Sequence, residues 1–227
     1  MGSDVPFEGI PPEAFDFYDR LAADNTKAFW LANRSTFETA VKAPVQSLCA
    51  RLAASGDDAP FHVFRPYNDA RFAKGRPPYK IHQGAYRETE GGAGQYLHIG
   101  ADGMMVATGY YGLAKDQLDR YRRAVADDRT GLALVAVTAA LAKRGYSVGA
   151  RDELRSAPRG YPKDHPRIEL LRRKGLIASR QFAVAPWMST AKAAAKVRDT
   201  WAGAAALCEW MDANVGPSTL PPDDGWR

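Results

Sequence analysis

The sequence predicts an α+β fold in which a mostly antiparallel sheet is flanked by N-terminal and C-terminal helices. Three observations support this prediction: helical spacing of apolar residues near the N-terminus, a run of short strand-like segments after it, and a return of helical spacing later. Helices and strands that are separated along a sequence in this way are typical of α+β proteins. A composition of 45% hydrophobic and 25% charged residues is sufficient for a buried core.

Two helical segments open the chain. The first covers residues 11–23, where two prolines suit the start because a helix needs no N–H donor there. A second helix is expected after Asn25, whose side chain can accept hydrogen bonds from the free N–H groups of a helix N-terminus. Its apolar face runs as far as Leu52. We expect Pro44 to kink or restart this helix, because proline cannot donate the helical hydrogen bond.

Four strand-like segments follow. They are short, rich in aromatic and branched residues, and bounded by Gly, Pro or Asp. The Asp102-Gly103 dipeptide between the last two predicts a hairpin turn, since such a turn needs positive φ angles. Their close succession favours antiparallel pairing, because parallel strands need a long crossover. The expected strands are Phe61–Arg65, Tyr79–Arg87, Gln95–Ile99 and Met104–Tyr111.

Helical spacing returns in the second half of the chain, interrupted by two more strand-like segments. Asp164 can cap a short helix over residues 165–174, and Gly175 suits its C-terminal end. The other expected elements are the helices Asp116–Asp127, Gly131–Arg144 and Ser189–Val215, and the strands Tyr146–Leu154 and Leu176–Ala185.

We expect a single domain over residues 1–227, because no stretch looks like a linker long enough to separate two. Within it, residues 11–55 are the helical lead-in and residues 60–185 the α+β core. Residues 189–215 form the C-terminal helix, and residues 216–227 are a tail rich in Pro, Gly and Asp.

Cysteine content and hydropathy favour a cytoplasmic protein. Two isolated cysteines, Cys49 and Cys208, build neither a disulfide framework nor a zinc site. The acidic segment 1–9 has no apolar core, so a secretory signal is not expected. The longest apolar run, Gly131–Ala142, is shorter than the roughly 20 residues of a membrane span. We therefore expect no membrane partner.

Basic residues gather in two parts of the chain, whose formal net charge is +5. Residues 143–180 hold 11 Lys and Arg against 4 Asp and Glu, and residues 65–80 hold five against Asp69 alone. Such clusters attract phosphate, nucleic acid or an acidic partner. The alternative is an ordinary solvated basic surface.

The segment 65–80 is the most distinctive part of the sequence. Several guanidinium groups on one strand-to-loop segment can grip an anion bidentately, and Asp69 can orient one of them. The alternative is a structural network that ties down a long loop. The expected ligand-binding residues of this segment are Arg65, Arg71, Arg76, Tyr79 and Lys80.

Residues 154–167 form a second candidate binding segment. Three prolines stiffen it and Gly160 permits an unusual turn, as in many binding loops. It presents Arg159 and Tyr161 before a helix N-terminus, whose partial positive charge suits anions. The alternative is that Asp164 is only a helix cap and the prolines only interrupt a loop.

No strong catalytic or cofactor motif is present. The sequence lacks a phosphate loop, a Gly-x-Ser-x-Gly elbow and a His-Glu-x-x-His motif. His82 and His98 lie on different expected strands and can meet across a sheet, but metal sites usually add further ligands. We predict neither a metal nor a cofactor.

The two basic segments resemble the bacterial and fungal family called domain of unknown function 2461. That family carries Arg-x-x-Arg-Asp-x-Arg-Phe before Pro-Tyr-Lys, which here reads Arg65-Pro-Tyr-Asn-Asp-Ala-Arg71-Phe72 and Pro78-Tyr79-Lys80. The resemblance covers about residues 11–185. Further matches are Asn25, Phe37, Gly109-Tyr110, Leu118, Arg122-x-Ala-Val125, Pro158-Arg-Gly-Tyr161, Asp164-His-Pro166 and Leu170-Leu-Arg-x-Lys174.

The chain departs from the family pattern at three positions. Asn68 stands where the family usually has Arg, Gly75 where it has Asp or Asn, and Arg76 replaces Lys. Any chemistry that required an arginine at position 68 or an acid at position 75 would be absent here. The resemblance implies no activity, and it agrees with an interpretation in which both basic segments belong to one site.

The leading hypothesis is a basic, tyrosine-lined cleft that binds a small anion bearing phosphate or carboxylate. Whether the protein is an enzyme stays open; the candidate catalytic residues are Asp69 and His165, the latter because imidazole titrates near neutral pH. The alternatives are a nucleic-acid-binding module and a non-catalytic interaction protein with structural arginines. The sequence does not indicate an oligomeric state. The expected clamp and lining are Arg65, Arg71, Arg76, Lys80, Arg122 and Arg159 with Tyr79, Tyr110 and Tyr161.

Overall fold

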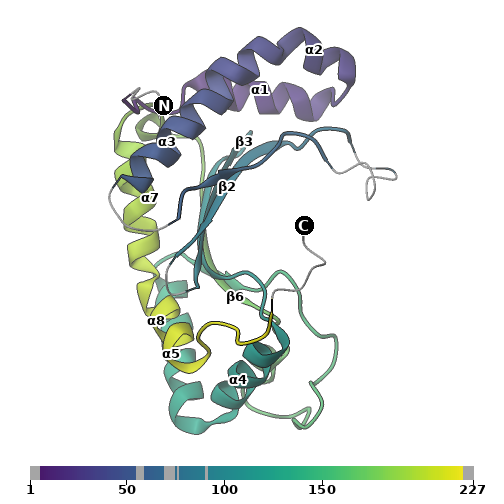
Figure 1. Ribbon diagram of the computed structural model, residues 1–227, viewed down its shortest axis with the longest axis vertical. Coiled ribbons are helices and arrows are strands. Elements are labelled where there is room, and N and C mark those ends of the chain that lie inside the picture. The colour runs from purple at the N-terminus through teal and green to yellow at the C-terminus, as the bar shows by residue number, and fades with distance from the viewer. Residues whose placement is uncertain (1–5, 55–58, 69–74, 76, 90–91, 222–227) are drawn as a thin grey trace. The chain divides into compact units, whose positions relative to one another are not determined.

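The computed structural model describes residues 6–54, 59–68, 75, 77–89 and 92–221 (Figure 1). The chain forms two compact units, and the single domain expected from the sequence stays a prediction. The first unit comprises Met1–Arg87, Gln95–Val106 and Gln181–Trp201, and the second comprises Glu88–Gly94, Ala107–Arg180 and Ala202–Arg227. No helix among the described residues is long and apolar enough to cross a membrane.

The strands form one six-stranded antiparallel sheet, which confirms the predicted α+β class. Their order is β1-β2-β3-β4-β6-β5. Val63 of β1 lies opposite Ala85 of β2, and Val148 of β5 lies opposite Ala178 of β6. The strands are β1 (His62–Val63), β2 (His82–Glu88), β3 (Gly94–Gly100), β4 (Gly103–Tyr110), β5 (Ser147–Gly149) and β6 (Leu176–Phe182).

The predicted hairpin at Asp102-Gly103 joins β3 and β4. Gly103 has a φ of +107°, in the left-handed region that favours glycine. A Cβ atom at this position would overlap the main-chain oxygen of Phe182. Both the turn and the packing of β4 beside β6 therefore require glycine here.

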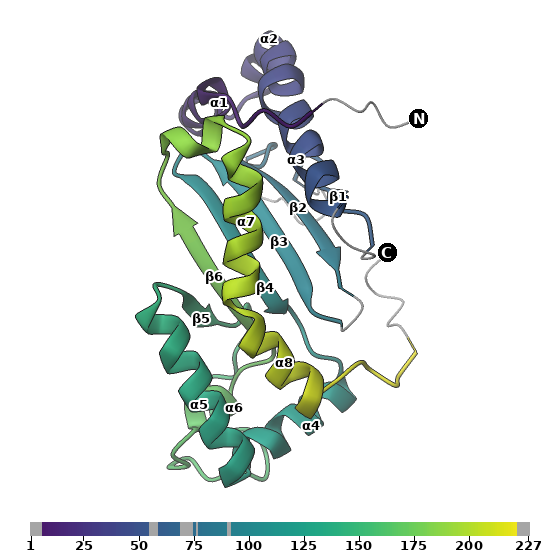
Figure 2. The ribbon, with the colours of Figure 1, turned by 90° about the vertical axis from the view of Figure 1, so that its left-hand side faces the viewer.

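Helices cover one face of the strands in the first unit. Their apolar side chains pack on Ala85, Leu97 and Met104 of the sheet. Figure 2 shows α7 in front of β3 and β4, and Val197 of α7 belongs to the same buried cluster. The helices of this part are α1 (Pro12–Ala23), α2 (Lys27–Thr36), the π-helix η1 (Phe37–Lys42), α3 (Ala43–Ala53), the short 3-10 helix η3 (Pro186–Ser189) and α7 (Lys192–Gly203).

The prediction that Asn25 caps the second helix was wrong. The Thr26 hydroxyl takes that role and accepts a hydrogen bond from the Phe29 N–H at 3.2 Å. Asn25 instead holds Tyr79, 54 residues later. Its Nδ2 donates to the Tyr79 carbonyl oxygen at 3.0 Å, and the Tyr79 N–H donates to its Oδ1 at 3.1 Å. The side chain thereby fastens the end of segment 65–80 to the helices.

The disruption expected at Pro44 takes the form of a π-helix. Pro44 has no N–H to donate to the Ala40 carbonyl, so the α-helical ladder is interrupted there. The Ala43 N–H donates to the Glu38 carbonyl, five residues earlier. A π turn holds about one residue more than an α turn and is frequent at functional sites.

The second unit has its own buried core. Tyr121 of α4, Leu134 of α5 and Met211 of α8 are fully buried in one cluster. Asp127 caps α5 by accepting the Thr130 N–H at 3.0 Å. The helices are α4 (Lys115–Ala126), α5 (Asp128–Lys143), α6 (Ile168–Leu171) and α8 (Ala205–Asn214).

Two expected helices were wrong in extent. The helix predicted over residues 165–174 is the single turn α6, and Asp164 is exposed and does not cap it. The helix expected over Ser189–Val215 ends at Gly203, and α8 starts two residues later. A Cβ atom at Gly203 would overlap the Tyr146 hydroxyl, so a larger residue here would have to displace that side chain.

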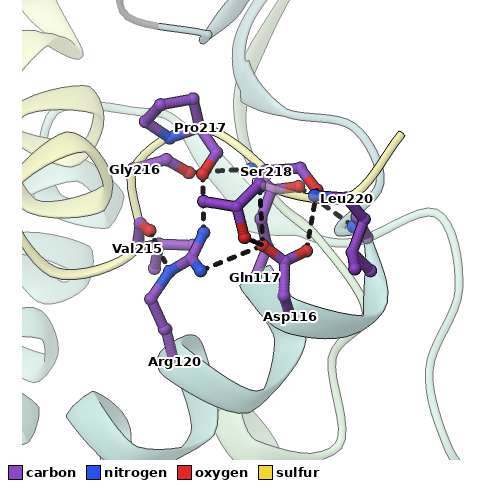
Figure 3. Close-up of polar contacts among 10 residues, drawn as sticks. Asp116, Gln117, Arg120, Val215, Gly216, Pro217, Ser218 and Leu220 are labelled. Carbon is purple, nitrogen blue, oxygen red and sulfur yellow. Dashed lines mark hydrogen bonds and ion pairs between the residues drawn. The ribbon is translucent and has the colours of Figure 1, made fainter. Parts of the chain in front are cut away.

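The chain after α8 is fixed to the first turn of α4 (Figure 3), and we call residues 215–220 the C-terminal strap. The Asp116 carboxylate accepts hydrogen bonds from the Thr219 N–H at 2.9 Å and from the Ser218 hydroxyl at 2.7 Å. Arg120 donates to the same carboxylate at 3.0 Å and to the Pro217 carbonyl at 2.7 Å. These donors, the Thr219 N–H foremost, hold the pKa of Asp116 well below its usual range.

Candidate functional site

The residues predicted to form one site fall in both units. Asp69, Arg71 and Arg76 lie outside the described residues. Their convergence with the second basic segment stays a prediction, so each unit is described by itself. The described members are Arg65, Tyr79 and Lys80 in the first unit, and Tyr110, Arg122, Arg159, Tyr161 and His165 in the second.

A cavity of about 280 Å³ lies in the first unit, between the helices α2, η1 and α3 and the chain from Val63 to Tyr67. We call it the basic cavity. Of the residues predicted from the sequence it contains Arg65, and it also contains Arg34, Lys42 and Gln83, for which no role was predicted.

The helical wall of the basic cavity is a row of residues spaced four apart: Trp30, Arg34, Glu38, Lys42 and Gln46. In an α-helix each step of four residues over-rotates by about 40°, so such a row drifts around the helix. The π-helix η1 holds more residues per turn and rotates the row back. The π turn thus keeps both ends of the row in one wall.

Cations outnumber acids in the basic cavity. Of the described residues that line it, only Glu38 bears a carboxylate, and its Oε2 accepts a hydrogen bond from Lys42 Nζ at 2.7 Å. No hydrogen bond or ion pair with another described residue holds the guanidinium groups of Arg34 and Arg65. Because each guanidinium carries five N–H donors in a planar fork, the pair can bind an anion.

The rim of the basic cavity, residues 65–67, is held in place by Lys80. Its ammonium group donates to the carbonyl oxygens of Arg65 at 2.7 Å and Tyr67 at 2.5 Å. The Lys80 N–H also donates to the Pro66 carbonyl at 2.7 Å. Lys80 therefore shapes the rim, and the anion contact expected from the sequence for its ammonium group stays a prediction.

An aromatic cluster supports the same rim. Tyr79 stacks on Trp30 with ring centroids 4.3 Å apart and an interplanar angle of 8°. Tyr67 packs on both rings, 5.8 Å from Trp30 and 5.5 Å from Tyr79. Tyr79 is only 5% exposed, and burial, with a smaller effect of Tyr67, raises its pKa. Tyr67 is 49% exposed, so it presents more aromatic surface than the predicted Tyr79.

Gln83 adds a buried polar group to the wall. It is 1% exposed, and its Nε2 donates to the Phe64 carbonyl at 2.7 Å and the Gly84 carbonyl at 3.1 Å. Its Oε1 accepts no hydrogen bond from another described residue. A donor group on a ligand in the cavity can therefore bond to this oxygen.

A histidine pair lies on neighbouring strands of the first unit, as the sequence allowed. The rings of His82 and His98 have centroids 4.7 Å apart, and the Tyr96 hydroxyl lies 2.9 Å from His98 Nδ1. Burial, followed by the effect of His82, lowers the pKa of His98 to about 4, and burial and Lys80 lower the pKa of His82. Among the described residues, no group of three or more His, Cys, Asp or Glu could hold a metal ion.

Several basic side chains of the second unit are part of the fold. Arg167 is 6% exposed and donates to the carbonyl oxygens of Val125 at 2.6 Å and Ala126 at 2.8 Å. It also forms an ion pair with Asp128 at 2.8 Å. Other basic side chains of this unit also donate hydrogen bonds. They include Arg122, which donates to the Leu171 carbonyl at 3.4 Å, Arg172, which donates to the Leu154 carbonyl at 2.6 Å, and Lys174, which donates to the Asp152 carboxylate at 2.7 Å.

The remaining predicted residues of the second unit have different surroundings. Tyr110 is 3% exposed and donates to Asp212 at 2.5 Å; burial, followed by this bond, raises its pKa. Arg159 is exposed, and Tyr161 is half-buried against the core. His165 accepts the Arg167 N–H on Nδ1 at 3.0 Å, so it stabilises the start of α6.

Comparison with known proteins identifies the family of this chain. No curated protein matches the chain. The family of conserved hypothetical proteins designated DUF2461 matches residues 13–210, a range that holds both basic segments and the whole of the basic cavity. This match confirms the resemblance seen in the sequence, and the chain belongs to the DUF2461 family.

Proposed function

We propose that this protein binds a small anion, bearing phosphate or carboxylate, in the basic cavity. A single observation carries the proposal. Arg34 and Arg65 line a cavity whose described carboxylate, Glu38, is already paired with Lys42. Both arginines are exposed to solvent at this cavity, and an anion bound between them would relieve their mutual repulsion.

The wall is organised for such a ligand before the ligand arrives. Lys80 fixes the rim, and the reciprocal bonds between Asn25 and Tyr79 fasten that rim to the helices. A site that is rigid in advance loses less conformational entropy when it binds. We propose no catalytic step, because Glu38 is the one described carboxylate of the lining and it is engaged with Lys42.

Phosphate titration of the full chain tests the proposal. Phosphate should raise the melting temperature beyond a chloride control of equal ionic strength, since binding at a hundredfold excess over Kd stabilises by about 2.7 kcal/mol. The double variant Arg34→Ala/Arg65→Ala should lose this gain. The matched control is Arg51→Ala/Lys143→Ala, which removes two exposed cations outside the cavity and should keep it. An equal gain in wild type and Arg34→Ala/Arg65→Ala would refute the anion site.

Single-stranded nucleic acid is the second candidate, favoured by the exposed Tyr67 ring two residues from Arg65. Salt dependence separates the two. An oligonucleotide loses affinity with a log–log slope of about −0.7 for each phosphate contacted, so a long footprint gives a steep slope. A single anion held by two arginines gives a shallow one, which is the result expected under the proposal.

A further inference from the structure

We propose that the anion bound in the basic cavity carries a planar aromatic ring, which stacks on Tyr67. This inference rests on the proposed function and adds the chemical class of the ligand. It is carried by the size of the cavity, the placement of Tyr67 and the unused oxygen of Gln83.

The basic cavity is larger than a bare anion needs. Inorganic phosphate has only five atoms other than hydrogen. The volume of about 280 Å³ lies just below the range for organic ligands, about 300–1,000 Å³. A phosphate or carboxylate attached to one ring would fill it better.

Tyr67 is built as a stacking surface. Its ring packs on Trp30 and Tyr79, and its main chain is bridged to Tyr79 and bound by Lys80. Nearly half of the residue remains exposed at 49%. An aromatic ring supported on one side and open on the other can stack a second ring at little entropic cost.

The anion and the ring would be held by neighbouring residues. Arg65 and Tyr67 both line the cavity and are separated only by Pro66, whose ring restricts the backbone between them. Gln83 Oε1, in the same wall, accepts no hydrogen bond from another described residue. A ring substituent with an N–H or O–H group would satisfy that oxygen. These contacts describe one ligand with an anionic group, a planar ring and a donor.

Three probes test the inference on the full chain by titration calorimetry: inorganic phosphate, phenyl phosphate and cyclohexyl phosphate. The two esters have the same charge and similar size, and only phenyl phosphate is planar. We expect phenyl phosphate to bind about fivefold more tightly than cyclohexyl phosphate. Tyr67→Leu should abolish this preference while phosphate binding changes by less than about twofold. Tyr67→Phe should retain the preference. The matched control is Tyr111→Leu, an exposed tyrosine of the second unit, which should change nothing.

The outcomes separate this inference from the proposed function. If phenyl and cyclohexyl phosphate bind alike in wild type, the ring is refuted while the anion site stands. If none of the three probes binds, both are refuted. If Tyr67→Leu weakens all three probes equally, or Tyr67→Phe loses the preference, then Tyr67 only maintains the rim and stacking is refuted.

Discussion

The two basic segments of this protein use arginine in opposite ways. In the second unit, Arg167 is buried and its donors meet carbonyl oxygens and a carboxylate. In the first unit, Arg65 lines a cavity and no described residue pairs with its guanidinium. The residue type and the local density of charge are alike in the two segments. The difference is whether the fold supplies hydrogen-bond acceptors for the guanidinium group.

The acceptors of Arg167 come from a helix end. The last carbonyl groups of a helix have no partner within the helix, and those of Val125 and Ala126 lie at the end of α4. Arg65 follows the two-residue edge strand β1, and no oxygen of a described residue accepts a hydrogen bond from its side chain. The helix C-terminus thus supplies acceptors to Arg167, whereas Arg65 has no acceptor among the described residues, which is consistent with the anion site proposed above.

Replacement of each arginine is the strongest test of this contrast. Arg167→Met should lower the free energy of unfolding by about 2–4 kcal/mol, because it leaves buried carbonyl groups without donors. Arg65→Met should change it by less than about 0.5 kcal/mol, as for most exposed side chains. Urea denaturation of both variants measures the difference. A similar loss in both would remove the distinction between the two segments.

The space around Arg167 gives a second, somewhat smaller test. A Cβ atom at Gly131 would overlap the Val125 carbonyl oxygen and lie 2.6 Å from Arg167 Nε. Ala normally favours a helix over Gly by about 1 kcal/mol. Here we expect Gly131→Ala to destabilise the protein by about 1–3 kcal/mol, because it disturbs the buried arginine.

Gly112 provides the matched control, because a Cβ atom there would meet nothing within 4 Å. Gly112→Ala should leave the free energy of unfolding nearly unchanged in the same denaturation experiment. If Gly131→Ala is also neutral, the packing around Arg167 is looser than its contacts imply.

The sequence predicted the fold class well, because hydrophobic periodicity and turn residues are local signals. It failed where a distant residue decided between local options. Asn25 and Thr26 are both good helix caps, and the choice depends on Tyr79, which is 54 residues away and needs the Asn25 side chain.

The candidate site was less accessible to sequence reasoning. Arg65 was identified, whereas Gln83 lies in a strand with no motif, and its role depends on the cavity beside it. A sequence pattern did indicate Arg34. It belongs to a row at intervals of four with Glu38 and Lys42, but the apolar face of the same helix was the stronger pattern. Whether the two basic segments meet in one site stays a prediction.

We expect acid to lower the stability of the first unit by protonating its histidines. The pKa of His98 is about 4 in the folded chain and about 6.5 when exposed, so the unfolded chain binds more protons between these values. The stabilising contribution of neutral His98 is therefore complete above pH 6.5 and is lost as the pH falls towards 4. The slope is at most about 1.4 kcal/mol per pH unit. Denaturation at several pH values should show a flatter profile for His98→Gln than for wild type, and identical profiles would contradict the burial of a neutral ring.

The smallest effect is expected at the C-terminal strap, where Arg120 binds carbonyl groups as Arg167 does but near the surface. Asp116→Ala removes the acceptor of the Thr219 N–H, while Arg120 still donates to Val215 and Pro217. The strap should therefore loosen without global unfolding: the Thr219 amide should exchange its hydrogen faster, and the urea midpoint should hardly move.

In the wild type the protection of the Thr219 amide against exchange should persist below pH 4, because the contribution of a carboxylate with a lowered pKa is lost only as the pH falls through its folded value. Loss of Thr219 protection already near pH 5 would show that the carboxylate does not hold the strap, and a large fall in the urea midpoint would make the strap part of the core.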